Sequence, residues 1–271
     1  MAFLQEVAET EPIIQVTDSL QVRHTVWRVA DPEKIRQLQA WLSGKTVVIT
    51  DGHHRYESAL AYRDEMRGRG GWTQDSAFNF HLCYMVPFQE EGLRVLPTHR
   101  LLREFKLTSR AMRDFERFFD VSEVEPTAEG LEGFLKSHLS EHAFGVYDGS
   151  KAYSLTLKHE ESVYDFVRAN VSKEVRIFDV VILRDIVFKC ILKTGKLNMD
   201  ENILYVRWTR EAVEKVNRGE ASIAFLVNPI SAQTVAEIAQ QHELLPEKST
   251  DFYPKVVSGL MMMDISAGEK L

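Results

Sequence analysis

Residues 46–60, TVVITDGHHRYESAL, carry the main sequence signal for the fold. The β-branched run at 46–50 predicts a buried strand, and Asp51-Gly52 predicts a tight turn. From His53 onward the apolar spacing favours a helix that runs to Gly68. The stretch therefore predicts a strand, a glycine turn and a helix, with two histidines and an arginine at the helix start.

A helix that begins at a glycine turn is suited to binding an anion. Backbone N–H groups without a helical partner and the positive end of the helix dipole face the turn. Gly52 lets the backbone approach a ligand closely, and Arg55 adds donors suited to phosphate. In the alternative interpretation, Asp51 only caps the helix while His53 and His54 are solvated.

Two further segments offer cations and hydroxyl groups in irregular backbone. LRVLPTHRLL (93–102) repeats the His-Arg pairing at His99-Arg100, and on its own it is typical of a surface loop. LPEKSTDFYPKVVSGL (245–260) places charged and hydroxyl groups among prolines and aromatic residues, and its alternative is a solvated tail. The candidate ligand-binding residues of the two segments are Thr98, Arg100, Lys248, Ser249, Thr250 and Lys255.

The remaining patterns indicate an α+β fold with a mixed sheet and additional helices. Helices are predicted at 30–44, 107–119, 127–139, 177–192, 209–221 and 231–243. Strands are predicted at 78–88, 93–97 and 222–229, with a turn at 89–92 and a hairpin at 143–158 around Asp148-Gly149. We expect one domain over 1–271 with two lobes, 1–122 and 123–271, and a KSTDFYPK segment that returns to the site in the first lobe.

Composition narrows the class of ligand and the compartment. The net charge of −7 argues against a protein that coats nucleic acid, and cations gathered in loops of an acidic chain favour a small anionic ligand. No window is long and apolar enough to predict a membrane span. Cys83 and Cys190 lie in apolar contexts, which predicts two buried thiols and a cytoplasmic protein. The oligomeric state is not indicated.

A metal site is a competing hypothesis. It would use His53, His54 and His99 with Asp51 or Asp18, although no spacing typical of zinc ligands occurs. Mg²⁺ that accompanies a nucleotide needs only one or two carboxylates, and Asp51 is a candidate.

The chain resembles an uncharacterised prokaryotic family, domain of unknown function 1015. The resemblance is carried by DGHHRYESAL (51–60), LPTHRLL (96–102) and PEKSTDFYPKVVSGL (246–260) in the same order. Weaker echoes are HTVWRV (24–29), YVRW (205–208) and AFLVNP (224–229). The resemblance covers nearly the whole chain, and it implies a short or truncated member because the family is usually longer at the N-terminus.

The stretch Gly52-His53-His54-Arg55 is also similar to the nucleotide-binding signature of sulfiredoxin and of the ParB N-terminal domain. This resemblance implies a ParB/sulfiredoxin-like element around 46–66 in which Gly52, His54 and Arg55 hold phosphate. His53 stands where sulfiredoxin has its catalytic cysteine, so sulfinic acid reduction is not implied. Some ParB-like proteins phosphorylate small hydroxyl metabolites with a carboxylate as base, and Asp51 or Glu57 would play that part.

Together these patterns predict an enzyme that binds either a nucleotide with Mg²⁺ or another phosphate ester. Its reaction would be phosphoryl transfer or phosphoester hydrolysis. Arg100, Lys248 and Lys255 would neutralise charge on the transferring oxygens, and His53 or His99 would act as general acid or base. We expect Arg55, Arg100 and Lys248 to face one cleft. The alternatives are a nucleotide-sensing module without catalysis and a histidine-dependent metallohydrolase.

Overall fold

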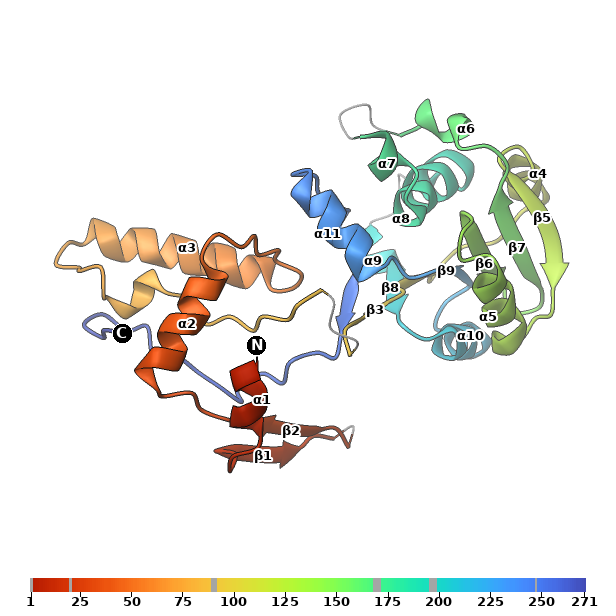
Figure 1. Ribbon diagram of the computed structural model, residues 1–271. Helices are drawn as coiled ribbons and strands as arrows, with labels where there is room; N and C mark the ends of the chain where they lie inside the picture. The colour runs from red at the N-terminus through yellow and green to blue at the C-terminus, as the bar shows by residue number, and fades with distance from the viewer. Residues whose placement is uncertain (1, 20, 89–91, 168–171, 195–198, 247) are drawn as a thin grey trace. The chain divides into compact units, whose positions relative to one another are not determined.

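The computed structural model describes residues 2–19, 21–88, 92–167, 172–194, 199–246 and 248–271 (Figure 1). The chain divides into two compact units, Met1–Val48 and Ile49–Leu271. The expected lobe boundary at 122/123 falls inside a strand, β5 (Phe119–Val124), of the second unit. The division into two lobes at that position stays a prediction.

The first unit combines a small antiparallel hairpin with two helices. Its elements are α1 (Ala2–Ala8), β1 (Ile14–Thr17), β2 (Arg23–Val26) and α2 (Pro32–Leu42). Helix α2 begins as the sequence predicts, because the Asp31 side chain accepts the Glu33 N–H and Pro32 occupies the first helical position. The Trp27 indole N–H donates to the Thr10 carbonyl, at 3.0 Å, and so ties the end of the hairpin to the segment after α1.

The second unit is built on a six-stranded sheet with strand order β5-β7-β6-β9-β4-β8. All strand pairs among the described residues are antiparallel. The other strands of the sheet are β4 (His99–Leu102), β6 (Ala143–Tyr147), β7 (Ala152–Leu157), β8 (Ile203–Val206) and β9 (Ile223–Val227), and a separate pair joins β3 (Arg94–Leu96) to β10 (Asp251–Tyr253). The α+β class is confirmed.

The second unit also contains several helices. They are α3 (His53–Gly68), α4 (Ser109–Phe115), α5 (Ala128–Ser137), α6 (Glu161–Tyr164), α7 (Lys173–Arg176), α8 (Asp179–Ile182), α9 (Met199–Asn202), α10 (Thr209–Asn217) and α11 (Ala232–Gln240), with a 3₁₀ turn at Ala77–Asn79 and a π-helical segment at Leu183–Ile191. In Figure 1, α5 and α10 lie together beside the sheet.

Strand β4 shows how the two faces are filled. Successive side chains of a strand point to opposite faces, so Leu101 joins the core cluster under α5 and α10. Its neighbour Leu102 joins the larger cluster with α8 and the π-helical segment. Close packing also requires a small residue at Gly145 of β6, where a Cβ would lie 3.0 Å from a Leu131 methyl group.

Local signals placed several elements correctly. The Asp148 carboxylate accepts the N–H groups of Ser150 and Lys151 in the predicted β6–β7 turn. Thr108 caps α4 by accepting the Ala111 N–H, and Ser231 caps α11 by accepting the Thr234 N–H. Helices α4 and α11 begin within two residues of the starts of the predicted ranges 107–119 and 231–243.

Two predicted strands are wrong. Residues 46–50 and 78–88 contain no strand, and the 78–88 stretch holds the 3₁₀ turn instead. β-branched residues fit a pleated surface only where a partner strand supplies it, and β3 pairs with β10 rather than with 78–88. Residues 89–91 of the predicted turn lie outside the described residues.

Two smaller expectations also differ. The helix predicted over 107–119 ends at Phe115, because Phe119 begins β5 and is buried against the sheet core. Cys83 is exposed, so the prediction of two buried thiols is wrong at that position, while Cys190 is partly buried. Within the described part of the chain, no helix has both the length and the apolar character needed to cross a membrane.

Candidate functional site

The turn at Gly52 opens helix α3. Gly52 is left-handed, with φ 82° and ψ 26°, and no side chain caps the helix. The first helical hydrogen bond runs from the Tyr56 N–H to the Gly52 carbonyl, at 3.0 Å. The N–H groups of residues 53–55 precede that bond and point out of the helix end, as the sequence predicts.

Arg55 folds back over the same glycine. A Cβ on Gly52 would lie 2.9 Å from Arg55 Nη2 and 3.0 Å from Nε, so the guanidinium occupies the space that a side chain at 52 would need. Arg55 Nη2 also lies 3.8 Å from Asp51 Oδ1. The arginine therefore lies beside the turn that the sequence assigned to an anion.

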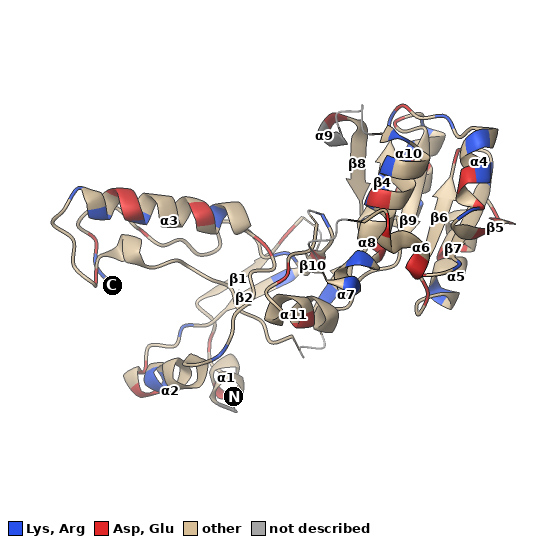
Figure 2. Cartoon of the chain, turned by 90° about the horizontal axis from the view of Figure 1, so that it is seen from above, with Lys and Arg blue, Asp and Glu red and all other residues tan. Residues whose placement is uncertain are grey.

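The two histidines of the turn are both exposed. His54 Nδ1 lies 3.3 Å from Glu57 Oε2, one helical turn further on. His53 is the first residue of α3. Solvent, and hence a ligand, reaches both rings. Figure 2 shows acidic and basic residues along the whole of α3. Met66 is the one residue of this helix that is buried.

The C-terminal segment reaches this turn through Lys255. The Lys255 ammonium donates to Asp51 Oδ2 at 2.7 Å, although 204 residues separate the two in sequence. The hydrogen bond from Lys255 holds the pKa of Asp51 below its usual value, against the opposing effect of partial burial. Burial lowers the pKa of Lys255, but the hydrogen bonds to Asp51 and Asp251 outweigh it, so that pKa is raised.

Lys255 is shared between two carboxylates. Its ammonium also lies 2.9 Å from Asp251 Oδ1. The other carboxylate oxygen, Asp251 Oδ2, accepts the Arg207 Nε–H. The sequence interpretation missed both Asp251 and Arg207. Asp251 lies inside the quoted KSTDFYPK motif and Arg207 inside the YVRW echo, so the motifs themselves contained the only signal.

The LPTHR segment joins the C-terminal segment by two routes. Strand β10 pairs with β3, which places Asp251 opposite Leu96. The buried guanidinium of Arg100 donates to the Lys248 carbonyl at 3.0 Å and to the Thr98 carbonyl at 2.6 Å. The three segments singled out from the sequence are thus linked to one another by hydrogen bonds and strand pairing.

Arg100 carries a buried charge that no carboxylate contacts among the described residues. Its partners are two neutral carbonyls and the ring of Tyr205, 5.9 Å from the guanidinium carbon. Burial lowers the pKa of Arg100 to about 10. It stays a cation at neutral pH, and a buried cation without a carboxylate favours a bound anion nearby.

His99 lies in a different environment from the exposed histidines. It is buried, and its Nδ1 accepts the Val227 N–H at 3.3 Å while its Nε2 faces the Thr209 hydroxyl at 3.3 Å. Burial, with the charge of Arg100, lowers the pKa of His99 to about 4. Both nitrogens are engaged within the core, which favours a structural role over general acid–base catalysis.

The remaining predicted residues of the C-terminal segment differ in accessibility. The Lys248 side chain is exposed on a left-handed backbone with φ 58°. Ser249 is buried, and its hydroxyl donates to the Pro246 carbonyl at 2.6 Å, while Thr250 is partly buried. Among the residues that the structure describes, nothing pairs with the Lys248 ammonium, whereas the Ser249 hydroxyl is already bonded.

The residues do not fit a protein-held metal ion. Within the described part of the chain, no group of three or more His, Cys, Asp or Glu side chains could hold a metal. Asp51 Oδ2 faces the Lys255 ammonium and its Oδ1 faces Arg55, so the carboxylate suggested for Mg²⁺ is occupied by cations. The histidine-dependent metallohydrolase thus lacks a ligand set here.

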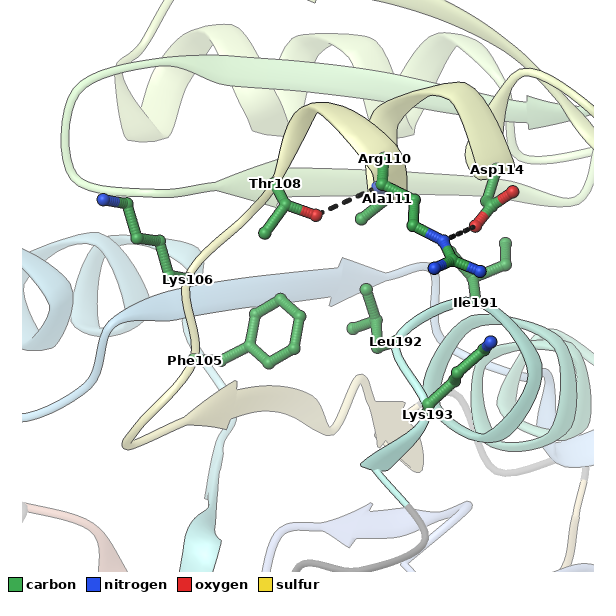
Figure 3. Close-up of a pocket in the computed structure, with 9 residues that line it drawn as sticks. All are labelled: Phe105, Lys106, Thr108, Arg110, Ala111, Asp114, Ile191, Leu192 and Lys193. Carbon is green, nitrogen blue, oxygen red and sulfur yellow. Dashed lines mark hydrogen bonds and ion pairs between the residues drawn. The ribbon is translucent and has the colours of Figure 1, made fainter.

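A separate hollow of about 230 Å³ lies between α4 and the end of the π-helical segment (Figure 3). It is lined by Phe105, Lys106, Thr108, Arg110, Ala111, Asp114, Ile191, Leu192 and Lys193. None of the predicted site residues lines it, so it does not supply the expected common cleft for Arg55, Arg100 and Lys248.

Comparison with known proteins gives a family match and distant structural similarities. The family model described as "Protein of unknown function (DUF1015)" matches residues 1–181. No curated protein matches the chain.

The similar solved structures include free serine kinase in complex with AMP, with TM-score 0.40 and 15% identity over 83% of this chain and 81% of that one. A mutant of free serine kinase with AMP gives TM-score 0.39 and 18% identity over 62% of this chain and 57% of that one. A conserved hypothetical protein from Pyrococcus furiosus gives TM-score 0.39 and 17% identity over 75% and 68%. Similarities at this level assign neither a ligand nor a reaction to this chain.

Proposed function

We propose that this chain, which belongs to the DUF1015 family of proteins of unknown function, is an enzyme that binds a nucleotide or another phosphate ester at the Gly52 turn. Its reaction would be phosphoryl transfer to a small metabolite or hydrolysis of a phosphate ester. The contact that carries the proposal is the hydrogen bond between Lys255 and Asp51. It brings a cation of the C-terminal segment to the N-terminal turn of α3, where phosphate groups are favoured.

In the proposed complex the phosphate lies against the start of α3. The N–H groups of residues 53–55 and the guanidinium of Arg55 donate to its oxygens, and the close approach depends on Gly52. His54 is the second side chain that reaches the ligand. Preorganised cations of this kind supply the largest share of the stabilisation expected in phosphoryl transfer, and Lys255 adds to it.

The outer residues extend the positive field around this ligand. Arg100 carries a buried charge, and Lys248 has an exposed ammonium on the segment that Arg100 holds. Thr98 and Thr250 add hydroxyl groups beside them, and Ser249 fixes the local backbone through Pro246. These residues would orient the phosphate ester or its acceptor, and none of them needs to contact the reacting oxygen.

The proposed chemistry requires a base that takes the proton of the attacking hydroxyl group or water. The acceptor hydroxyl, or water, forms a new P–O bond as the bond to the leaving oxygen breaks, and its proton passes to a base. His53, the exposed first residue of α3, is the proposed base. Glu57, which contacts His54, is the second candidate. A nucleotide would bring Mg²⁺ mainly on its own phosphates, and no step is assigned to the metal.

The first test compares the arginines at the two ends of α3. Arg55 and Arg69 are both exposed, at 73% and 63%, and each pairs with a carboxylate four residues earlier, Asp51 and Glu65. Arg55→Ala should weaken ADP binding by about tenfold or more, because charged hydrogen bonds to phosphate are lost. Arg69→Ala, at the other end of α3, should leave the affinity unchanged. Calorimetric titration with ADP measures both, and equal effects of the two substitutions would count against the proposed site.

Turnover separates the enzyme from the nucleotide-sensing alternative. The wild-type chain is incubated with ATP, ADP and simple phosphate esters, with and without a panel of small hydroxyl compounds. Stabilisation against heat that grows with nucleotide concentration indicates binding to the folded chain. Release or transfer of phosphate that is lost in His53→Gln supports the enzyme, whereas binding without any turnover supports a sensing module.

A further inference from the structure

Five charged side chains form a chain of alternating sign that begins at the glycine turn. In order they are Arg55, Asp51, Lys255, Asp251 and Arg207. Three cations and two carboxylates give the chain a net charge of +1, and a cation stands at each end. Each carboxylate is shared by two cations, and the central lysine is shared by the two carboxylates.

The two carboxylates that hold Lys255 differ in how firmly they are held themselves. The Asp251 side chain is 16% exposed, bonds Arg207 as well as Lys255, and lies on β10, whose backbone is paired with β3. The Asp51 side chain is 53% exposed, and its second cation, Arg55 Nη2, lies 3.8 Å away. Asp51 lies in the turn itself, outside any strand pair.

This difference decides which carboxylate an incoming anion replaces. An exposed ion pair contributes little, because water stabilises the two separate charges nearly as well as their mutual attraction does. A carboxylate that is more buried and held by two cations loses more when a partner leaves. The Lys255 ammonium lies slightly closer to Asp51 than to Asp251, at 2.7 Å against 2.9 Å, but the greater exposure of Asp51 makes it the more easily exchanged partner.

We propose that Asp251 is a positioning residue that holds Lys255 toward the site, while Asp51 is an exchangeable partner whose place a bound phosphate group takes. The inference rests on the proposed function, since it concerns the same anion site. Without a ligand, Asp51 pairs with Arg55 and Lys255, the two cations that a phosphate would bind. On binding, Lys255 and Arg55 turn from Asp51 to the phosphate oxygens, and Asp251 keeps the ammonium in place.

The proposal differs in sign from a purely electrostatic expectation. Both carboxylates lie near the anion, so if charge alone mattered, neutralising either one would tighten phosphate binding. If Asp251 positions Lys255, neutralising it loosens the lysine and weakens binding. If Asp51 competes with the ligand, neutralising it strengthens binding.

The experiment is a calorimetric titration of the wild-type chain, Asp51→Asn and Asp251→Asn with inorganic phosphate and, separately, with ADP, in the absence of divalent metal. Asp51→Asn should tighten phosphate binding about two- to fivefold, the factor that an exposed ion pair corresponds to. Asp251→Asn should weaken it about threefold or more. Glu65→Gln, which removes a carboxylate paired with Arg69 at the far end of α3, should change nothing.

Folding is controlled separately. Thermal unfolding of each variant without ligand shows whether it is folded, and Asp251→Glu, which keeps a carboxylate near Lys255, should recover most of the wild-type affinity. Tighter binding by both asparagine variants, or weaker binding by Asp51→Asn, would overturn the inference while leaving the site in place. If the wild-type chain binds neither phosphate nor ADP, the proposed function fails first, and this inference fails with it.

Discussion

Gly52 meets two separate requirements at one position. Its φ of 82° lies in the left-handed region, which costs a residue with a side chain roughly 1 kcal/mol. The Arg55 guanidinium also fills the space beside its Cα. The first requirement is common to many turns. The second links the identity of residue 52 to Arg55, which is proposed to bind the phosphate.

The two requirements can be separated by mutation. Gly52→Ala should destabilise the chain by about 1 kcal/mol and also weaken ADP binding, because the new methyl group displaces Arg55. Gly219→Ala is the matched control: Gly219 has φ 74°, and nothing lies within 4 Å of the Cβ position. It should show a similar loss of stability with unchanged affinity. Unfolding in urea and titration with ADP measure the two effects, and equal loss of affinity in both variants would contradict the role given to Arg55.

The sequence identified several residues of the site but not the contacts between them. Asp51 and Lys255 were both singled out, yet nothing in their types predicts that they touch. Asp251 lies four residues before Lys255, a spacing that predicts contact only on a helix, whereas the segment is a strand followed by irregular backbone. His99 looked equivalent to His53 because the sequence did not reveal that β4 is an inner strand with both faces buried.

Elements with local signals were predictable, and elements that depend on a distant partner were not. Thr108, Ser231 and the Asp148-Gly149 turn carry their structure in a few neighbouring residues, and their elements are found as predicted. The β-branched run at 46–50 has the propensity for a strand but pairs with no described strand. A strand is completed by its neighbour, so its pattern alone is insufficient.

His142 connects three elements of the second unit. It lies just before β6, and its Nδ1 is 2.8 Å from Asp179 Oδ1 at the start of α8. Its Nε2 is 3.5 Å from Glu160 Oε1, just before α6. The hydrogen bond to Asp179 raises the pKa of His142, against the lowering effect of burial, and Glu160 adds to the rise.

This raised pKa predicts a pH-dependent contribution to stability. The protonated imidazole is favoured in the folded chain, so its stabilising effect is complete below the unfolded value of about 6.5 and is lost as the pH rises through the higher folded value. The free energy of unfolding of the wild type should therefore exceed that of His142→Gln most at about pH 6, with a gap that narrows toward about pH 9. Urea unfolding at several pH values measures this gap, and a constant or widening gap would show that His142 is not the group responsible.

The chain is acidic as a whole, but it contains a cluster of side chains with a net positive charge. The chain as a whole has a net charge of −7, whereas the five side chains from Arg55 to Arg207 carry +1. The acidic background disfavours a polyanion, and the cluster favours a small one. The three contributing segments are recognisable in the sequence, but only the pairing of β3 with β10 and the bond from Lys255 to Asp51 relate them in space.

We expect the Gly52 turn and the C-terminal segment to form one phosphate-binding site. The direct measurement is a titration of the isotope-labelled chain with ADP, followed through the amide resonances of residues 52–55, 251–253 and 255. Both sets should shift together with a single dissociation constant, while the resonances at the Arg69 end of α3 stay in place. Shifts confined to one segment, or two different dissociation constants, would contradict a shared site.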